Sequence, residues 1–198
     1  MSFKEKPDFG TYHHSTASES VKIRKNIRGR FRKAFASIPF SRDDKIKILD
    51  VGCGLGFLSW VCAEYYPKAK VIGFDTFEHA SLKDSNLQKA KRNAKVLGFS
   101  ERIKFRKGDL FDSNFGRGKF DLIVANLVFH NFGKKRFGAY KRVVQWSTPN
   151  TYIVLGDVFF DYKKDLRNLS NLFGNVKKMP NLAIGTRYKM LALSEPKK

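Results

Sequence analysis

Three acidic residues lie at the ends of apolar runs, and each could bind a polar ligand. Asp50 lies near the end of one run, Asp75 ends the run KVIGFD, and Asp109 follows RIKFRKG. A carboxylate can accept two hydrogen bonds from a ribose diol, and it attracts a positively charged ligand while repelling a pyrophosphate. Ligands of open α/β sheets bind at the carboxyl ends of the strands. If the apolar runs are parallel strands, the three acids lie along one edge of the sheet.

The glycines after the first acid restrict the kind of ligand further. Residues 50–56 read DVGCGLG, so Gly52, Gly54 and Gly56 would let the chain turn sharply and a ligand approach the backbone. A dinucleotide fingerprint would need a glycine at Phe57, and no Gly-Lys-Ser/Thr follows for a phosphate loop. The pattern therefore favours a nucleoside that carries a positive charge. A plain strand-to-helix turn with tolerated glycines is the alternative.

The elements that must position these residues follow from hydrophobic periodicity. A helix is expected over 18–37, where apolar residues recur at helical spacing. Further along, apolar runs alternate with helical patterns, which predicts a mostly parallel sheet covered by helices on both faces. Residues 175–194 hold two strand-like runs without a helix between them, which predicts a hairpin with one antiparallel strand. The other expected strands are 46–51, 71–75, 103–107, 120–125 and 151–158, and the other expected helices are 57–66, 80–97, 134–147 and 161–173.

The stretch ILDVGCGLG, residues 48–56, resembles the first motif of class I S-adenosylmethionine-dependent methyltransferases, and the resemblance extends over residues 46–193. It implies an α/β fold, a Rossmann-like three-layer sandwich with a seven-stranded, mostly parallel sheet and one antiparallel strand in a C-terminal hairpin. It also implies S-adenosyl-L-methionine as the cofactor. We therefore divide the chain into residues 1–40, a polar segment with a basic amphipathic helix, and residues 41–198, the methyltransferase domain.

Within this resemblance the acids have separate roles. Asp75, nineteen residues after Gly56, would accept hydrogen bonds from the ribose, although it could instead cap a helix with Glu78 three residues on. The family's acid at the position of Asp109 accepts from the adenine amino group. The full set that we expect to bind the cofactor is Asp50, Gly52, Cys53, Gly54, Gly56, Asp75, Thr76, Asp109, Leu110 and Asn126. We assign no metal-binding residues.

The sequence FDLIVANLVFHNF, residues 120–132, bears on the acceptor. Family members that methylate exocyclic amines of bases or a glutamine amide carry Asn-Pro-Pro-Tyr/Phe here, whereas this chain has Asn-Leu-Val-Phe at 126–129. Because the prolines hold that loop rigid, their absence disfavours amine methylation of that type. The stretch also resembles the hydrophobic-His-Asn ending of members that methylate small molecules or carbon and oxygen centres. Asn126 and His130 are therefore expected to be catalytic, with His130 as a base or substrate-orienting group; a solvated loop histidine is the alternative.

The charge of the chain favours a polyanionic partner. Its 198 residues include 39 Lys and Arg against 18 Asp and Glu, a formal net charge of +21. Residues 21–42 contain no acid, and Lys25, Arg28 and Arg32 would share one face of the helix. Such a cluster suits a phosphate backbone, so we expect these three residues to contact an RNA substrate. A second basic cluster lies at 134–142, and a generally basic, solvated surface is the alternative to both.

The leading prediction is methyl transfer from S-adenosylmethionine, with RNA favoured as the substrate class. The alternatives are the same reaction on a small molecule or protein side chain, and a non-catalytic basic RNA-binding module with this fold. A nicotinamide oxidoreductase is disfavoured by Phe57 and Asp50. The two cysteines form no disulfide framework, no apolar run approaches the ~20 residues of a membrane helix, and the N-terminus has no signal-peptide pattern. We therefore expect a cytoplasmic protein without a membrane partner, and leave the oligomeric state open.

Overall fold

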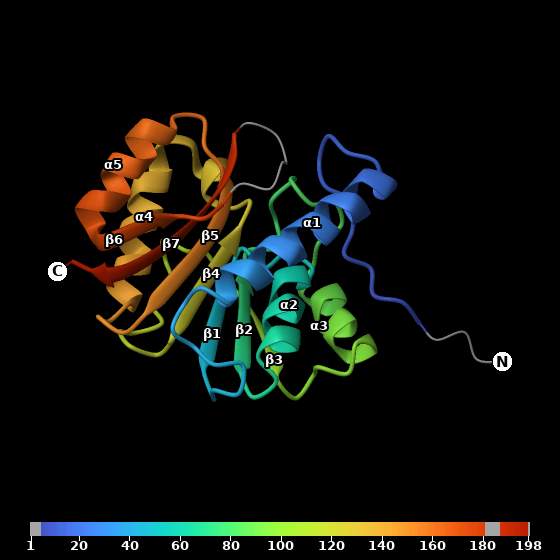
Figure 1. The fold of residues 1–198 in the computed structure, drawn as a ribbon. Coiled ribbons are helices and arrows are strands. Elements are labelled where there is room, and N and C mark those ends of the chain that lie inside the picture. The colour runs from blue at the N-terminus through green and yellow to red at the C-terminus, as the bar shows by residue number, and fades with distance from the viewer. Residues whose placement is uncertain (1–4, 181–186, 198) are drawn as a thin grey trace.

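The computed structural model of the protein describes residues 5–180 and 187–197. Its helices and strands alternate along most of the chain, as the periodicity predicts (Figure 1). In chain order they are α1 (Ala17–Phe35), β1 (Lys47–Val51), α2 (Phe57–Tyr65), β2 (Lys70–Asp75), α3 (Leu87–Val96), β3 (Ile103–Lys107), β4 (Leu122–Asn126), the 3₁₀ helix η1 (Phe129–Lys135), α4 (Arg136–Trp146), β5 (Tyr152–Val158), α5 (Tyr162–Leu172), β6 (Phe173–Lys178) and β7 (Tyr188–Pro196).

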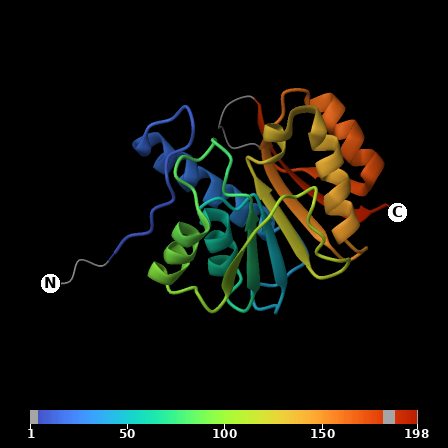
Figure 2. The same cartoon turned by 180° about the vertical axis from the view of Figure 1, so that it is seen from behind.

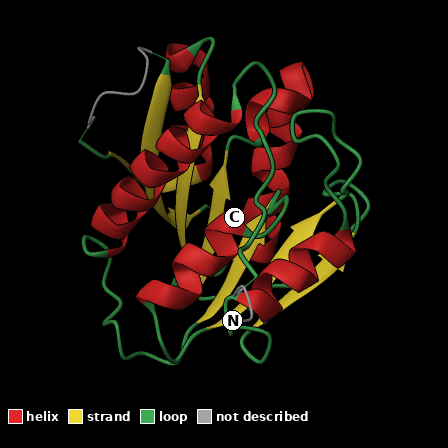
Figure 3. Ribbon diagram, turned by 90° about the vertical axis from the view of Figure 1, so that its right-hand side faces the viewer, coloured by secondary structure: helices red, strands yellow, loops and turns green. Residues whose placement is uncertain are grey.

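The strands form one sheet in the order β3-β2-β1-β4-β5-β7-β6, with β7 antiparallel to both of its neighbours and the other pairs parallel. Helices α1, α2 and α3 cover one face, and α4 and α5 cover the other (Figures 1 and 2). Figure 3 shows the sheet between these two helical layers. The three-layer fold with one antiparallel strand is therefore confirmed. Strand order reverses between β1 and β4, and ligands of such sheets bind at the carboxyl ends of the strands beside that point.

Helix α1 is part of the main hydrophobic core. A capping box between Thr16 and Glu19 begins the helix. Ile27, Phe31 and Phe35 are fully buried and pack in the same core cluster as α2, β1 and β2. The division at residue 40 therefore separates two sequence patterns rather than two hydrophobic cores.

Two helices differ from their predicted extents. The helix expected over 80–97 begins only at Leu87, where Asn86 caps it by accepting from the Lys89 backbone N–H. The residues before it form a loop that pairs with the N-terminal segment through a Tyr12–Leu82 bridge, and this tertiary contact competes with helix formation. The helix expected over 134–147 corresponds to α4, which begins at Arg136 because the 3₁₀ helix η1, with its break at Gly133, directly precedes it. Both hairpin strands are present, and residues 181–186 between them lie outside the described residues.

Candidate active site

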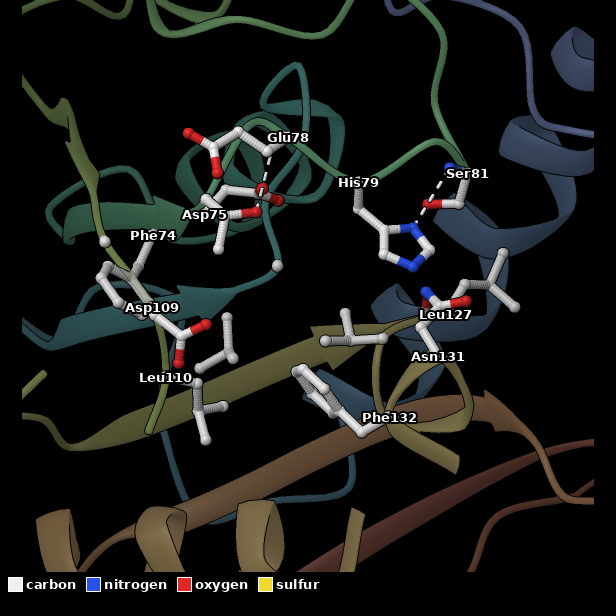
Figure 4. Close-up of a pocket in the computed structure, with 15 residues that line it drawn as sticks. Phe74, Asp75, Glu78, His79, Ser81, Asp109, Leu110, Leu127, Asn131 and Phe132 are labelled. Atoms are coloured by element: carbon white, nitrogen blue, oxygen red, sulfur yellow. Dashed lines mark hydrogen bonds between the residues drawn. The ribbon is translucent and has the colours of Figure 1, made fainter. Parts of the chain in front are cut away.

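Two adjoining cavities lie at the carboxyl ends of the strands. The first has a volume of about 320 Å³ and is lined by residues that end β2 and follow β3 (Figure 4). The second has a volume of about 540 Å³ and extends from the glycine turn to the N-terminal segment. The two cavities are continuous, so one ligand could reach from the first cavity into the second. The residues that line both cavities are Gly52, Asp75, His79, Ser81, Leu127 and Asn131.

The glycine turn has the backbone that its sequence predicts. Gly52, Gly54 and Gly56 all have positive φ, at 66°, 50° and 84°. A Cβ atom at Gly52 would overlap the side chain of Val128, and one at Gly54 would lie 2.9 Å from Leu82 Cδ2. The turn therefore requires glycine both for its backbone conformation and for the space around it.

Asp75 lies at the junction of the two cavities, at the end of β2. Its Oδ2 accepts from the Gly54 backbone N–H at 2.8 Å, and its Oδ1 accepts from the Phe77 N–H at 2.6 Å. Each carboxylate oxygen has a second lone pair for a ligand. The alternative role as a helix cap is excluded, because Asn86 caps the next helix. Thr76 lines the first cavity beside this acid.

Asp109 and Leu110 follow β3 and line the first cavity. Asp109 Oδ1 accepts from the Phe111 backbone N–H at 2.6 Å, and Leu110 is buried. Figure 4 shows Asp75 and Asp109 at one end of this cavity, with Phe132 on the opposite wall. Two carboxylates and apolar walls in one narrow space fit the polar edges and flat ring of a nucleoside.

Asp50 is placed differently from the other acids. Its side chain is buried, lines neither cavity and accepts from the Ser59 hydroxyl at 2.6 Å. Burial raises the pKa of Asp50 to about 7. The sequence suggested that Asp50 attracts a cationic ligand directly. In the structure Asp50 instead links β1 to α2 behind the turn. Cys53 is buried but does line the second cavity.

Asn126 and His130 both line the second cavity, and His130 pairs with an acid that the sequence analysis did not single out. The Nδ1 atom of His130 lies 2.5 Å from Asp157 Oδ1, and Asp157 Oδ2 accepts from the Phe129 N–H at 2.7 Å. Asp157 is 2% exposed. Asp157 could have been identified from the sequence, because it lies near the end of an apolar run, as Asp50, Asp75 and Asp109 do. The alternative for His130, a solvated loop histidine, does not fit, because the ring is paired with a buried carboxylate.

The N-terminal segment supplies one wall of the second cavity. Phe9, Tyr12 and His13 line it, and the His13 N–H donates to the Ser81 carbonyl at 3.0 Å. The Nη2 atom of the buried Arg24 donates to the carbonyl oxygens of Phe9 and Gly10. These contacts fix the segment beside the glycine turn, which sequence periodicity could not reveal.

The basic face predicted on α1 is divided by an acid from α2. Arg28 binds Glu64 through two nitrogens, with Nη2–Oε1 at 2.6 Å and Nε–Oε2 at 3.0 Å, and Arg32 Nη1 lies 3.3 Å from the same carboxylate. Lys25 is exposed and has no ion pair with any described residue. The three residues therefore do not form one free cationic surface, because two of them are partly neutralised by Glu64.

Comparison with known proteins places the chain in a family. The model of the methyltransferase domain family matches residues 42–192, and the chain belongs to this family. It is 31% identical to malonyl-acyl-carrier-protein O-methyltransferase of Legionella pneumophila over 118 residues, 60% of this chain and 37% of that protein. It is 35% identical to the tRNA1(Val) (adenine(37)-N6)-methyltransferase of Porphyromonas gingivalis over 85 residues, 41% and 31% of the two chains. These matches span only about a third of the relatives' own lengths.

Solved structures agree on the fold. The PH0226 protein of Pyrococcus horikoshii superposes with a TM-score of 0.65 and 18% identity, covering 92% of this chain and 94% of that one. Human N-acetylserotonin methyltransferase in complex with S-adenosylmethionine gives a TM-score of 0.60 and 17% identity over 90% of this chain and 57% of its own. Residues 42–192 thus form a methyltransferase domain, and the glycine turn with Asp75 and Asp109 is a site that fits a nucleoside such as that of S-adenosylmethionine.

Two further features of the structure bear on the sequence predictions. Among residues 5–180 and 187–197, no helix is long and apolar enough to cross a membrane. In the same described ranges, no group of three or more His, Cys, Asp or Glu side chains is arranged to hold a metal ion. A cytoplasmic location stays a prediction.

Proposed function

We propose that this methyltransferase methylates the oxygen of a hydroxyl group on a small acceptor, with His130 as the general base. The observation that carries the proposal is the pairing of His130, which lines the second cavity, with the buried Asp157. Among the alternatives raised by the sequence, this proposal corresponds to a small-molecule substrate.

The pair defines where the imidazole can accept a proton. With the buried Asp157 carboxylate accepting from Nδ1–H, the neutral His130 ring carries its lone pair on Nε2. This Nε2 has no hydrogen-bond partner among the described residues, so it can accept the proton of a hydroxyl group. The cofactor supplies an already activated methyl group. The protein then needs to orient the acceptor oxygen and to exclude water.

The second cavity has the size and walls of a small-molecule site. Its volume of about 540 Å³ lies within the range usual for pockets that enclose small ligands. The side chains of Phe9, Tyr12, Phe57 and Phe160 contribute aromatic surface to it. A planar acceptor would bury its faces against such rings while its hydroxyl group meets His130.

The test measures where a tritiated methyl group goes. We expect transfer from S-adenosylmethionine into the metabolite fraction of the source cell, rather than into its RNA or protein. Asp157→Asn should lower turnover of that fraction about 10²–10⁴-fold, because it removes the group that orients the base. Affinity for S-adenosylmethionine in calorimetry should be unchanged. Asp161→Asn, at the exposed cap of α5, is the matched control. Label in RNA or protein alone, or full activity of Asp157→Asn, would contradict the proposal.

RNA is the second candidate acceptor, favoured by a basic groove on the outer side of α1. Lys22, Lys25 and Lys33 are exposed there and line the groove with the buried Arg30. None of the three lysines forms an ion pair with a described residue. A phosphate backbone would meet three lysines without ion pairs on this surface. On the other side of α1 it would meet Arg28 and Arg32, which Glu64 partly neutralises.

Salt dependence distinguishes this groove from a generally basic surface. Log affinity for single-stranded RNA should fall with log salt by about 0.7 per phosphate contact. Changing Lys22, Lys25 and Lys33 to Gln should reduce the slope by roughly 2. The control removes equal charge at the far end of the sheet, through Lys163→Gln, Arg167→Gln and Lys177→Gln. Equal slopes for both triple variants would mean that α1 is not the contact.

A further inference from the structure

Asn126 makes a hydrogen bond to a residue from the last strand of the chain. The Tyr188 hydroxyl donates to Asn126 Oδ1 at 2.8 Å. Tyr188 is 5% exposed, and burial raises the pKa of its phenol above the usual range. The hydroxyl group therefore keeps the proton that it donates in this bond.

The bond crosses β5 at a glycine. Asn126 of β4 pairs in register with Gly156 of β5, while Tyr188 of β7 pairs with Val158. A Cβ atom at Gly156 would overlap the Tyr188 hydroxyl oxygen and lie 3.2 Å from Asn126 Oδ1. The absence of a side chain at Gly156 leaves the space in which the two groups meet.

The other side of the phenol ring is held by α1. The guanidinium of Arg30 lies over the Tyr188 ring, 5.2 Å from its centroid. Arg30 is 5% exposed, and its Nε and Nη2 atoms have no hydrogen-bond partner among the described residues. Arg30 therefore attracts this ring through the cation–π interaction. The position of the Tyr188 hydroxyl is consequently set by β5 on one side and by Arg30 on the other.

The bond determines which end of the Asn126 amide meets the acceptor. Because Oδ1 faces Tyr188, the Nδ2 group is the free end of the amide, and it has no hydrogen-bond partner among the described residues. An amide N–H donates to oxygen, so it would bind an oxygen atom of the acceptor close to His130. An amine acceptor would instead need a free side-chain carbonyl oxygen to accept its N–H. The Asn126 Oδ1 atom is not free, because it already accepts from Tyr188.

We propose that Tyr188 is a positioning residue that orients the Asn126 amide with its N–H groups toward an oxygen atom of the acceptor. The consequence for substrate binding rests on the proposed function, in which the acceptor is a hydroxyl group. The orientation itself can be tested without any acceptor. In this arrangement Gly156 and Arg30 are needed to place the phenol, and Asn126 makes the contact with the substrate.

The orientation is tested by residual dipolar couplings of the Asn126 side-chain amide in protein labelled with ¹⁵N-asparagine. The probe bound to the protein is S-adenosylhomocysteine, and Asn126→Ala assigns the signal. We expect large couplings in the wild type, indicating one fixed orientation. In Tyr188→Phe, which retains the ring over Arg30, the couplings should fall at least twofold. Gly156→Ala should have the same effect by displacing the hydroxyl group.

The control for a purely structural effect is Tyr140→Phe. It removes another buried hydroxyl, which donates to Asp165 at 3.0 Å on the opposite face of the sheet. Its Asn126 couplings should equal those of the wild type. Unchanged couplings in Tyr188→Phe, or an equal fall in Tyr140→Phe, would overturn the assignment of Tyr188.

A kinetic measurement separates this proposal from the proposed function, with catechol as the hydroxyl probe. If catechol is methylated, Tyr188→Phe should reduce kcat/KM about tenfold, and it should cause no further loss in the Asn126→Ala background. Independent, multiplying losses would contradict the coupling between the two residues. If catechol and other hydroxyl probes are not methylated while the couplings behave as expected, the hydroxyl-acceptor function fails and the orientation of Asn126 stands.

Discussion

Acidic side chains near the ends of the strands differ mainly in their access to the cavities. Asp75 and Asp109 accept backbone N–H groups and face the first cavity, while Asp157 is buried behind His130. Asp50 is buried against Ser59 and faces neither cavity. All four are aspartates that lie at, or within two residues of, the carboxyl end of a strand. The solvent access and partners of each carboxylate decide whether it faces a cavity, pairs with His130 or links two elements.

The pKa of Asp50 leads to a prediction about stability. Its value of about 7 in the folded protein lies above the ordinary 3.8, so the folded state holds a proton that the unfolded state has lost. The free energy of unfolding should therefore fall as pH rises from about 4 to about 7, and then level off. Asp50→Asn cannot ionise and should escape this loss. Urea unfolding at several pH values should show its stability rising relative to the wild type across that interval.

A control keeps this effect distinct from general charge effects. Asp161→Asn removes an exposed carboxylate at a helix cap and serves as the control for the loss of one negative charge. If Asp50→Asn runs parallel to the wild type over the whole range, the Asp50 carboxyl is not the group that titrates.

At the scale of elements, the strand β1, the glycine turn and α2 act as one unit. The turn is hydrogen-bonded to β2, because the backbone N–H groups of Gly52 and Cys53 both donate to the Phe74 carbonyl. Leu82, from the loop before α3, lies over Gly54 and joins this unit to the N-terminal segment. The shape of the cofactor site thus depends on a loop that contacts it from outside the β1–α2 unit.

Two glycines with similar backbones allow this to be tested. Gly54 has a φ of 50° and lines the second cavity, whereas Gly98 has a φ of 79° and nothing within 4 Å of an added Cβ. Alanine at either position should cost about 1–2 kcal/mol of unfolding free energy, because both adopt the left-handed conformation. Only Gly54→Ala should weaken S-adenosylmethionine binding, at least tenfold in calorimetry. Equal affinity in both variants would show that the turn is purely structural.

At the scale of the whole molecule, the N-terminal region completes both the core and the site. Helix α1 buries Ile27, Phe31 and Phe35 against the sheet and α2, and the preceding segment forms a wall of the second cavity. The family model begins only at residue 42. A boundary drawn from the family match or from the charge pattern would therefore remove part of this structure.

Truncation should reveal this dependence. Burial of each of these three side chains contributes roughly 1.5–3 kcal/mol, against a total stability of about 5–15 kcal/mol for ordinary domains. A chain that begins at residue 41 should therefore show no cooperative thermal transition. A chain that begins at residue 8 retains α1 and should unfold cooperatively near the wild-type temperature. A cooperative transition in the shorter chain would mean that residues 41–198 form an independent domain.

The sequence by itself determined the family, the alternating elements and the edge of the sheet where the candidate cofactor site lies. These features depend on local rules that can be read along the chain. Apolar runs of strand length predicted the parallel sheet, and the spacing of Gly52, Gly54 and Gly56 predicted a turn whose positive φ angles only glycine adopts easily. Asp75 could be assigned to the cofactor edge because it ends a strand.

Only the tertiary structure decided which side chains meet. Glu64 neutralises Arg28 from 36 positions away, Asp157 orients His130 from 27 positions, and Tyr188 reaches Asn126 from 62 positions. No periodicity connects residues at such separations, because their contacts depend on how the strands are ordered and how the helices pack on them. The loop before α3 was predicted as helix for the same reason: its contacts with the N-terminal segment outweigh its local preference.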